Sequence, residues 1–424
     1  MRKVLTAFGA LVAACIGLSS CGNNYNPYTT GGQKLAPSTG LTFRVFVSNP
    51  LFSNGASNAP VLNIIDATTD LLSPATVSLA GTVSNPGLMA QTPDKNRILV
   101  FSDAENRVAV VDKASQSATG AIGLPGATTS LIALLDNATA YAAVQTAAVA
   151  GQTPGAVEVL DIVNGKIKAT IPVPNAKTVV LSQKGGTVLA FGDSTTATVI
   201  TVANVGTNAT AVVPVAGFDH PVSAVFSADD TKAYVLECGA ECGGTTSAVT
   251  VLDLTTDTIG ARVPVSAATI GFLDGTTLFV AGTPAGQMCE SGTAATSCGV
   301  LTAINTQTLT ASGTTATITD GYHDRMVLTG DGQIYIGANH CTEINTSGGG
   351  TEVRGCLSIF NTADGSVTIP PDSGDVTGIQ SIVSRKRVYL VQGNQVRIYS
   401  TTDNKLQAQQ PDIVGPAVDV KLVD

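Results

Sequence analysis

Residues 86–126 read PGLMAQTPDKNRILVFSDAENRVAVVDKASQSATGAIGLPG, and they contain the repeating unit of the chain. Four short apolar or alternating runs, GLMAQ, RILVFS, RVAVVD and TGAIGL, are separated by turn residues at 93–95, 103–106 and 113–117. Apolar alternation bounded by Gly, Pro, Asn, Asp and Ser is typical of β-strands joined by tight turns. The unit therefore predicts a four-stranded antiparallel meander.

The second strand of this unit recurs along the chain. Its copies are RVFVSN at 44, RILVFSD at 97, AYAAVQ at 140, VLAFGD at 188, AYVLEC at 233, LFVAGT at 278, IYIGAN at 334 and VYLVQG at 388. The seven intervals span 344 residues, a mean period of about 49 residues that is near the length of a propeller blade. We predict an all-β, closed β-propeller of eight four-stranded antiparallel blades with almost no helix. Seven blades are the alternative, if one hairpin is an insertion within a blade.

Ring closure can be predicted from the two ends of the repeat region. The first copy starts at Thr42 with no inner strand before it, and the eighth copy is expected to have its outer strand at 406–414. Residues 416–424, PAVDVKLVD, then form an additional alternating run. Pairing this run with the N-terminal hairpin at Arg44 would complete the first blade and remove two exposed strand edges.

Two of the copies carry a family resemblance. Residues 249–265, VTVLDLTTDTIGARVPV, and 157–173, VEVLDIVNGKIKATIPV, resemble the YVTN-type propeller repeat, as does SADDTKAYV at 227–235. The resemblance implies a β-propeller outside the cytoplasm, on the cell surface or in the periplasm, with a repeat that is structural. Copies four, six, seven and eight depart from the pattern, since they have Asn204, Asn305, Asn361 and Ser400 at or near the usual Asp. Any short polar residue can begin this turn, so we expect the fold to be unaffected. The departures do weaken the assignment of the family's function to this chain.

The N-terminus carries an export signal. Arg2 and Lys3 precede an uncharged stretch at 4–18, which suits a signal peptide but is too short to span a membrane. It ends in Leu-Ser-Ser-Cys21, which resembles the bacterial lipobox and implies that Cys21 is lipidated. A plain secretory signal with an incidental Cys21 is the alternative.

These features predict three segments. Residues 1–20 are a lipoprotein signal peptide, residues 21–41 a lipidated cysteine with a flexible tether rich in Asn, Gly, Thr and Pro, and residues 42–424 the propeller. An Asp after the cysteine would resemble the inner-membrane retention signal of some Gram-negative lipoproteins. Gly22 occupies this position instead, which favours the outer membrane. We expect a lipid-anchored protein of the bacterial cell envelope, facing the periplasm or the cell surface.

Six further cysteines fall into three local pairs, each between the second and third strands of copies five, six and seven. In an exported protein, separations of three, eight and fourteen intervening residues favour disulfides over a metal site. Free or differently paired thiols are the remaining alternative. The predicted pairs are Cys238 with Cys242, Cys289 with Cys298, and Cys341 with Cys356.

The position of these cysteines predicts a loop-rich face. In a four-stranded meander, the connection between strands two and three emerges at the same end as the link between blades. Copies one (48–60) and three (145–155) also have extended connections there. We expect this face to bind a partner; neutral drift of loops, which tolerate insertions, is the alternative.

The candidates for chemistry are few. His220 and His323 immediately precede predicted inner strands, where side chains can face the central channel, and Asp219, Asp324 and Arg325 lie beside them. Divalent-metal binding or acid–base chemistry would use these residues, but ordinary polar loop residues are the preferred interpretation. His340, the third histidine, is expected on the same face. No nucleophile, zinc-helix or phosphate-loop motif occurs, so we predict no catalytic residue, no metal and no cofactor.

Composition narrows the function further. A net charge of −9 without any basic block argues against nucleic-acid binding, and the absence of Trp argues against Trp-docked quinone cofactors. We predict a monomeric binding scaffold, attached to the membrane through its lipid, with a protein or an envelope component as partner. A lactonase-like hydrolase with its site in the central channel is the alternative.

Overall fold

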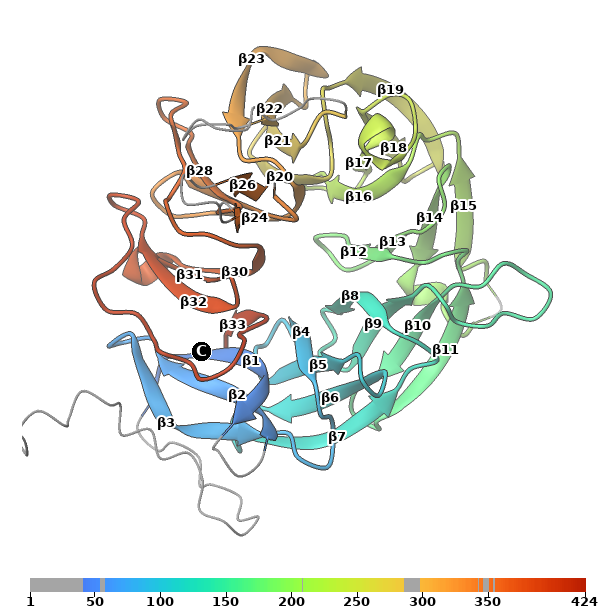
Figure 1. Cartoon of the computed structure of the whole chain (residues 1–424). Coiled ribbons are helices and arrows are strands. Elements are labelled where there is room, and N and C mark those ends of the chain that lie inside the picture. The colour runs from blue at the N-terminus through green and yellow to red at the C-terminus, as the bar shows by residue number, and fades with distance from the viewer. Residues whose placement is uncertain are drawn as a thin grey trace, which may run out of the picture. The chain divides into compact units, whose positions relative to one another are not determined.

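The repeating strands form a ring of eight blades in the computed structural model (Figure 1). The structure describes residues 41–424 except 54–57, 208, 286–297, 342, 346–350 and 354. The chain divides into two units, Met1–Gln33 and Lys34–Asp424, and the ring belongs to the second. The predicted signal peptide, Cys21 and the tether up to residue 40 lie outside the described residues.

Each blade corresponds to one copy of the repeat. Blade 1 contains β1 (Arg44–Ser53), β2 (Asn58–Asp66), β3 (Leu71–Ser78) and β33 (Val420–Leu422). Blade 2 contains β4 (Pro86–Gln91), β5 (Arg97–Ser102), β6 (Arg107–Asp112) and β7 (Ser117–Gly123). Blade 3 contains β8 (Thr128–Ala133), β9 (Thr139–Val144), β10 (Ala156–Asp161) and β11 (Lys166–Pro172). Blade 4 contains β12 (Thr178–Leu181), β13 (Thr187–Phe191), β14 (Thr196–Thr201) and β15 (Val212–Ala216).

The second half of the ring follows the same plan. Blade 5 contains β16 (Pro221–Phe226), β17 (Lys232–Glu237), β18 (Ala248–Asp253) and β19 (Thr258–Pro264). Blade 6 contains β20 (Ile270–Asp274), β21 (Thr277–Gly282), β22 (Gly299–Asn305) and β23 (Thr310–Ile318). Blade 7 contains β24 (Tyr322–Leu328), β25 (Gln333–Asn339), β28 (Leu357–Asn361) and β29 (Val367–Thr368). Blade 8 contains β30 (Val376–Ile382), β31 (Arg387–Gln392) and β32 (Gln395–Ser400).

In Figure 1, one edge strand of each blade, for example β4, β8 or β16, lies nearest the centre of the ring. Within a blade, each strand pairs antiparallel with its neighbour. The helical elements of the described residues are three short 3₁₀ turns, η1 (Val202–Asn204), η2 (Gly239–Cys242) and η3 (Val383–Arg385). No helix in the described part of the chain has the length and apolar character needed to cross a membrane. The eight-blade prediction is confirmed, and the seven-blade alternative is wrong.

The predicted ring closure is also confirmed. β33 pairs antiparallel with β1, so that Val45 lies opposite Leu422 and Val47 opposite Val420. The strand that completes blade 1 therefore comes from the other end of the repeat region. This pairing occupies the inner edge of β1, which would otherwise expose unpaired backbone groups.

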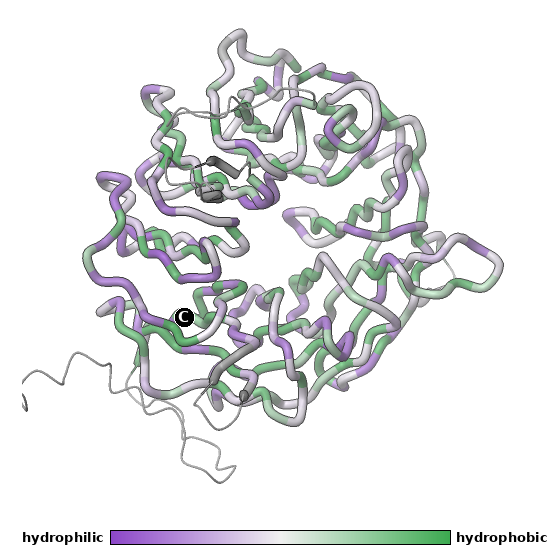
Figure 2. The backbone as a smooth tube through the Cα atoms, viewed as in Figure 1, coloured by the Kyte–Doolittle hydropathy of each residue, from purple (hydrophilic) through white to green (hydrophobic). Residues whose placement is uncertain are grey.

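The central strands of the blades, such as β5, β6 and β9, are buried almost continuously because both faces of each blade pack against neighbouring blades. Figure 2 shows hydrophobic residues recurring along the strands of the ring. The buried apolar side chains that the structure describes form eight clusters, each drawing on two adjacent blades. Tyr141, Tyr335 and Tyr389 are among the largest fully buried side chains. Burial of one large apolar side chain contributes about 1.5–3 kcal/mol, so each interface is a separate source of stability.

The turn that follows the third strand explains why the degenerate copies keep the fold. In blade 5, Asp253 Oδ1 accepts the backbone N–H of Thr255 (2.8 Å). In blade 6, Asn305 Oδ1 accepts the N–H of Gln307 (2.9 Å), and Asn361 makes the corresponding bond in blade 7. Asn and Asp side chains both stabilise such turns, so the predicted tolerance of Asn305 and Asn361 is confirmed. Blade 4 differs, because Asn204 lies in η1.

The outer edge of blade 8 differs from the expected continuous strand at 406–414. Leu406 forms only an isolated antiparallel bridge with Tyr399. Beyond it, the side chain of Gln410 replaces a neighbouring strand: its Oε1 accepts the N–H of Ile398 (2.8 Å) and its Nε2 donates to the Ile398 carbonyl (3.2 Å). Pro411 follows at once and has no N–H to continue a ladder, so pairing ends here.

The expected open loop at 48–60 is also different. β1 extends to Ser53 and β2 begins at Asn58, and the two strands pair up to Ser53 and Asn58 with a register shift between Asn49 and Phe52. Most of this connection is therefore part of a long hairpin. The connection at 145–155 in blade 3 is a loop, as predicted, between β9 and β10.

Candidate functional site

One end of the ring carries the links between blades and the connections between second and third strands; we call it the loop face. Cys238 and Cys242 form a disulfide there, directly after β17 and across η2, with their Cα atoms 5.7 Å apart. Cys341 and Cys356 form a second disulfide, with Cα atoms 5.8 Å apart. The predicted local pairing is present at both sites.

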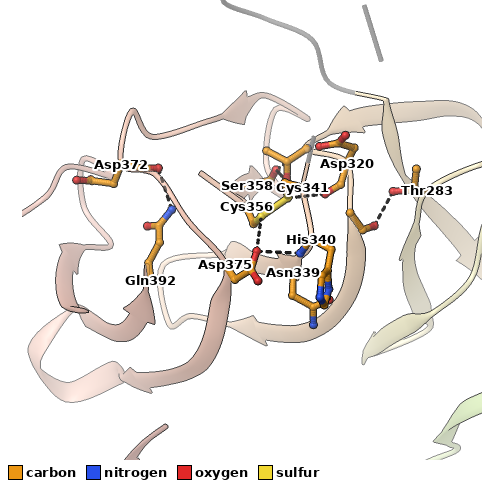
Figure 3. Close-up of a disulfide and its surroundings, with 12 residues drawn as sticks. Thr283, Asp320, Asn339, His340, Cys341, Cys356, Ser358, Asp372, Asp375 and Gln392 are labelled. Carbon is orange, nitrogen blue, oxygen red and sulfur yellow. Dashed lines mark hydrogen bonds between the residues drawn. A yellow bond between two sulfur atoms is a disulfide. The ribbon is translucent and has the colours of Figure 1, made fainter. Parts of the chain in front are cut away.

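The second disulfide closes the base of an insertion. The connection from β25 to β28 contains a small hairpin of β26 (Glu343–Asn345) and β27 (Thr351–Val353), and the bridge lies where the hairpin leaves the blade (Figure 3). Cys289 lies outside the described residues, so its pairing with Cys298 stays a prediction.

A cavity of about 1010 Å³ lies where the inner strands of blades 3 to 7 face one another. Its lining includes His220 from the link between blades 4 and 5, Asp193 from the β13–β14 connection of blade 4, and Cys242 from the disulfide loop. The cavity therefore reaches the loop face, and we call this end the cavity mouth. Its lining residues are Thr129, Ser130, Gln145, Asn175, Lys177, Thr178, Val179, Val180, Phe191, Gly192, Asp193, Ser194, His220, Pro221, Val222, Ser223, Cys242, Thr269, Ile270, Tyr322, Asp324 and Arg325.

His220 contributes to the cavity from the link that enters blade 5, as its position immediately before β16 predicts. Its Nδ1 lies 2.9 Å from Oδ1 of Asp219. Oδ2 of Asp219 accepts the backbone N–H groups of Thr245 (2.9 Å) and Thr246 (2.8 Å). The hydrogen bond with His220, together with those from Thr245 and Thr246, holds the pKa of Asp219 far below its usual range. A permanently ionised carboxylate thus orients the imidazole, which leaves Nε2 for a ligand.

Asp324 and Arg325 line the same cavity from β24 in blade 7. The register of β24 with β25 shifts between His323 and Arg325, a bulge that places two consecutive side chains toward the cavity. Arg325 Nη1 lies 3.0 Å from Asp324 Oδ2, and Arg325 Nε donates to the carbonyl of Thr377 (3.0 Å). Burial raises the pKa of Asp324, although Arg325 opposes this rise. The pair is therefore held rigidly at the cavity wall.

His323 does not face the channel, and this part of the prediction is wrong. The residue lies inside β24 rather than before it, and it is completely buried. Successive side chains of a strand point to opposite faces, so Tyr322 and Asp324 face the cavity while His323 packs into the ring. Burial lowers the pKa of His323 to about 4, although a hydrogen bond with the backbone of Thr319 opposes this shift. The imidazole is therefore neutral at physiological pH.

The third histidine lies at the rim. The backbone N–H of His340 donates to Oδ1 of Asp375 (2.8 Å), and its Nδ1 lies 2.8 Å from Oδ1 of Asn339, beside the Cys341–Cys356 disulfide (Figure 3). Asn339 in turn donates to Oδ2 of Asp324 (3.2 Å). All three histidines thus belong to the loop face, as predicted, but only His220 lines the cavity. Within the described ranges, no group of three or more His, Cys, Asp or Glu side chains is arranged to hold a metal ion.

Sequence reasoning missed two residues of this region, Glu241 and Tyr322. Glu241 lies within the Cys238–Cys242 loop, and its Oε2 accepts the N–H of Thr283 in blade 6 (3.1 Å). Burial raises the pKa of Glu241 to about 7. Burial and the carboxyl groups of Glu241 and Asp324 raise the pKa of Tyr322 to about 12, so its hydroxyl stays protonated. The only signals in the sequence were the acid inside CGAEC and the aromatic residue beside His323.

No protein-family model matches the sequence, and no curated protein matches it. Among solved structures, the ring is similar to dihydro-heme d1 dehydrogenase NirN in complex with DHE, with 13% identity, a TM-score of 0.64, and coverage of 90% of this chain and 75% of that one. It is also similar to the Dos1 propeller, with 10% identity, a TM-score of 0.60, and coverage of 80% and 86%.

A third similar structure is hydrazine synthase from Kuenenia stuttgartiensis, with 14% identity, a TM-score of 0.55, and coverage of 77% of this chain and 95% of that one. The activities named for two of these proteins, a dehydrogenase and a synthase, differ from one another. At such low identities the likeness extends to the fold and not to the chemistry of the site. The structure and its neighbours together identify the described part of the chain as an eight-bladed β-propeller.

Proposed function

We propose that this protein is a lipid-anchored binding scaffold of the bacterial cell envelope, which captures a partner through its loop face. One observation carries the proposal: two disulfide-closed connections, the long connection at 145–155 and the cavity mouth all occur at the same end of the ring. Binding residues concentrate on loops that a rigid scaffold positions, and a propeller supplies such a scaffold.

The opposite end of the ring supports this assignment by contrast. Most of its turns are short, the connection at 202–211 in blade 4 being an exception, and turns of neighbouring blades bond to one another. The N–H of Asp94 in blade 2 donates to Oδ1 of Asn137 in blade 3 (2.9 Å), and the N–H of Gln183 in blade 4 donates to Oδ1 of Asp230 in blade 5 (3.0 Å). Backbone groups there are used for holding the ring together, so the loop face is the better candidate for recognition.

The proposal includes the location of the protein in the cell envelope and its membership of the YVTN-type propellers. The order of charge, apolar core and Leu-Ser-Ser-Cys21 supports lipidation at Cys21, and the disulfides suit an oxidising compartment. The repeats at 157–173 and 249–265 support descent from YVTN-type propellers. Growth with labelled palmitate tests the anchor: the wild-type protein should be labelled, and a Cys21→Ser protein should not.

A hydrolase of lactonase-like type is the second candidate, and one observation favours it. The pairing of His220 with Asp219 beside the cavity is the arrangement by which enzymes orient a general base. The buried position of His323 removes one member of the set predicted for such a site. We therefore place binding ahead of catalysis.

Capture from envelope extracts tests the scaffold function. The protein would be immobilised, and one partner should be retained reproducibly by the wild type. A Gln152→Arg, Thr153→Arg variant changes the loop face of blade 3 and should lose that partner. A Val163→Arg, Asn164→Arg variant makes the same change in an exposed turn at the opposite end of blade 3 and should keep it. Equal retention by both variants would contradict the proposal. A His220→Ala variant that binds normally but loses a measured turnover would favour the hydrolase.

A further inference from the structure

Tyr322 has an unusual position for an aromatic residue of this protein. The residue is 39% exposed, more than any other aromatic residue whose exposure the structure describes, although its surroundings desolvate the hydroxyl enough to raise its pKa. It lines the cavity from the first position of β24, beside Asp324 and Arg325. An exposed aromatic ring can provide a large apolar contact area, and Tyr is enriched at binding interfaces. The ring is thus available as an apolar platform at the cavity mouth.

Polar groups that line the cavity together with Tyr322 retain unused hydrogen-bonding capacity. Arg325 uses Nε and Nη1 within the protein, and its Nη2 has no acceptor among the described residues. Oδ1 of Asp193 accepts the N–H groups of Thr195 (2.9 Å) and Thr196 (2.6 Å), whereas Oδ2 has no partner in the described part of the chain. Nε2 of His220 accepts a hydrogen bond when the ring is neutral, because Nδ1 faces Asp219. The cavity lining therefore offers both hydrogen-bond donors and acceptors.

The formal charges of the lining cancel. Lys177 and Arg325 supply two positive charges, and Asp193 and Asp324 supply two negative ones. Much of the remaining polar lining consists of neutral hydroxyl and amide side chains, including Gln145, Asn175, Thr178, Ser194, Ser223 and Thr269. Each hydroxyl or amide can both donate and accept. Such a lining does not favour a strongly charged ligand, and it matches a neutral ligand that carries many hydroxyl groups.

We propose that the cavity mouth binds an uncharged saccharide, whose C–H face packs against the ring of Tyr322 and whose hydroxyl groups bond to Arg325, Asp193 and His220. The volume of about 1010 Å³ is at the upper end of ligand pockets, which span about 300–1,000 Å³, so an oligosaccharide fits better than a single sugar. This inference rests on the proposed function, since it names the chemistry of an envelope component that the loop face would recognise.

Isothermal titration calorimetry with three trisaccharides tests the proposal. The probes are cellotriose and triacetylchitotriose, which are uncharged, and trigalacturonate, which is acidic. We expect the wild type to bind at least one uncharged probe, and Tyr322→Ala to bind it at least about tenfold more weakly, a loss typical of an anchoring aromatic side chain. Tyr322→Phe keeps the platform and should stay within about threefold of the wild type. Lys168→Gln removes a charge from the outer strand β11 and should change nothing.

Three results would overturn the saccharide proposal: no heat with any probe, binding of trigalacturonate alone, or unchanged affinity in Tyr322→Ala. Thermal unfolding of each variant shows that the ring is intact before binding is compared. The capture experiment separates this failure from that of the scaffold function. A wild-type protein that retains its envelope partner through the loop face but binds no trisaccharide keeps the scaffold function and loses only the saccharide assignment.

Discussion

Arg44 and Asp424 form a two-point ion pair although 380 residues separate them in the sequence: Nε lies 2.6 Å from Oδ2, and Nη2 lies 2.7 Å from Oδ1. Both side chains are largely buried, with 11% and 14% of their surface exposed. Lys113 of blade 2 places its Nζ 3.6 Å from the same carboxylate. The pair thus reinforces the backbone pairing of β1 and β33 that closes the ring.

Replacing Asp424 by Asn should destabilise the protein, because the Arg44 guanidinium would be left largely buried without its counter-charge. Loss of one partner of a well-buried pair costs about 3–5 kcal/mol, and partial exposure here reduces the expected loss to about 2–3 kcal/mol. Urea unfolding followed by circular dichroism measures it. Asp257→Asn, in a turn of blade 5 that tolerates Asn at a φ of 53°, should change the midpoint little. Equal midpoints for the two variants would contradict the role given to the pair.

His323 should make the protein sensitive to mild acid. Its pKa is about 4 in the folded state and about 6.5 in the unfolded state, so the unfolded chain binds more protons between these values. Stability should therefore rise with pH from about 4 to 6.5. His323→Leu removes this pH-dependent contribution, so it should unfold at a higher denaturant concentration than the wild type at pH 5. His340→Asn, at the exposed rim histidine, is the control. If the stability of His323→Leu rose with pH as steeply as that of the wild type, the assignment would be refuted.

Glu241 should act in the opposite direction over an overlapping range. Burial raises its pKa from 4.5 to about 7, so the folded state holds the proton more tightly than the unfolded state. Its contribution to stability is complete below pH 4.5 and is lost as pH rises through 7. Glu241→Gln keeps an acceptor for the Thr283 N–H and removes the titration. On going from pH 5 to pH 8, the unfolding free energy should therefore change in a more favourable direction in Glu241→Gln than in the wild type, because the opposing contribution of His323 remains. An unchanged difference would show that Glu241 is not responsible.

The two described disulfides should differ in their contribution to stability. In the chain-entropy description, the stabilisation grows with the length of the closed loop. The Cys341–Cys356 bridge, with a sequence separation of 15, should contribute about 3 kcal/mol, and Cys238–Cys242, with a separation of 4, about 2 kcal/mol. Double Cys→Ala variants at each site, compared by denaturant unfolding, measure the difference. The Cys341→Ala, Cys356→Ala variant should also be cleaved sooner by protease between these positions. A larger loss at the shorter loop would contradict this account.

Mass mapping of non-reduced peptides tests the remaining cysteine pair. A peptide containing Cys289 should be recovered linked to one containing Cys298, because both occupy the connection in blade 6 that corresponds to the bridged connections of blades 5 and 7. Reduction should release both peptides. A cross-link from Cys289 to a cysteine of another blade would exclude local pairing there.

The periodicity of apolar residues was enough to predict the strands, the number of blades and the strand that closes the ring. These features depend on local alternation and on repetition at a nearly constant interval, and both are visible in a single chain. The outer edge of blade 8 could not be predicted in this way. There the alternating run at 406–414 suggests a strand, but Gln410 satisfies the backbone of Ile398 with its side chain and Pro411 ends the pairing.

By itself, the sequence determined the all-β class, the eight-part ring, the two described cysteine pairs and the end of the ring on which the histidines lie, since each follows from strand order and turn position. Only the tertiary structure decided which side chains face the cavity. In β24, a one-residue shift against β25 places Tyr322, Asp324 and Arg325 on the cavity side and buries His323. The direction of a strand side chain reverses with every residue, so such a shift changes the site while leaving the sequence pattern almost unaltered.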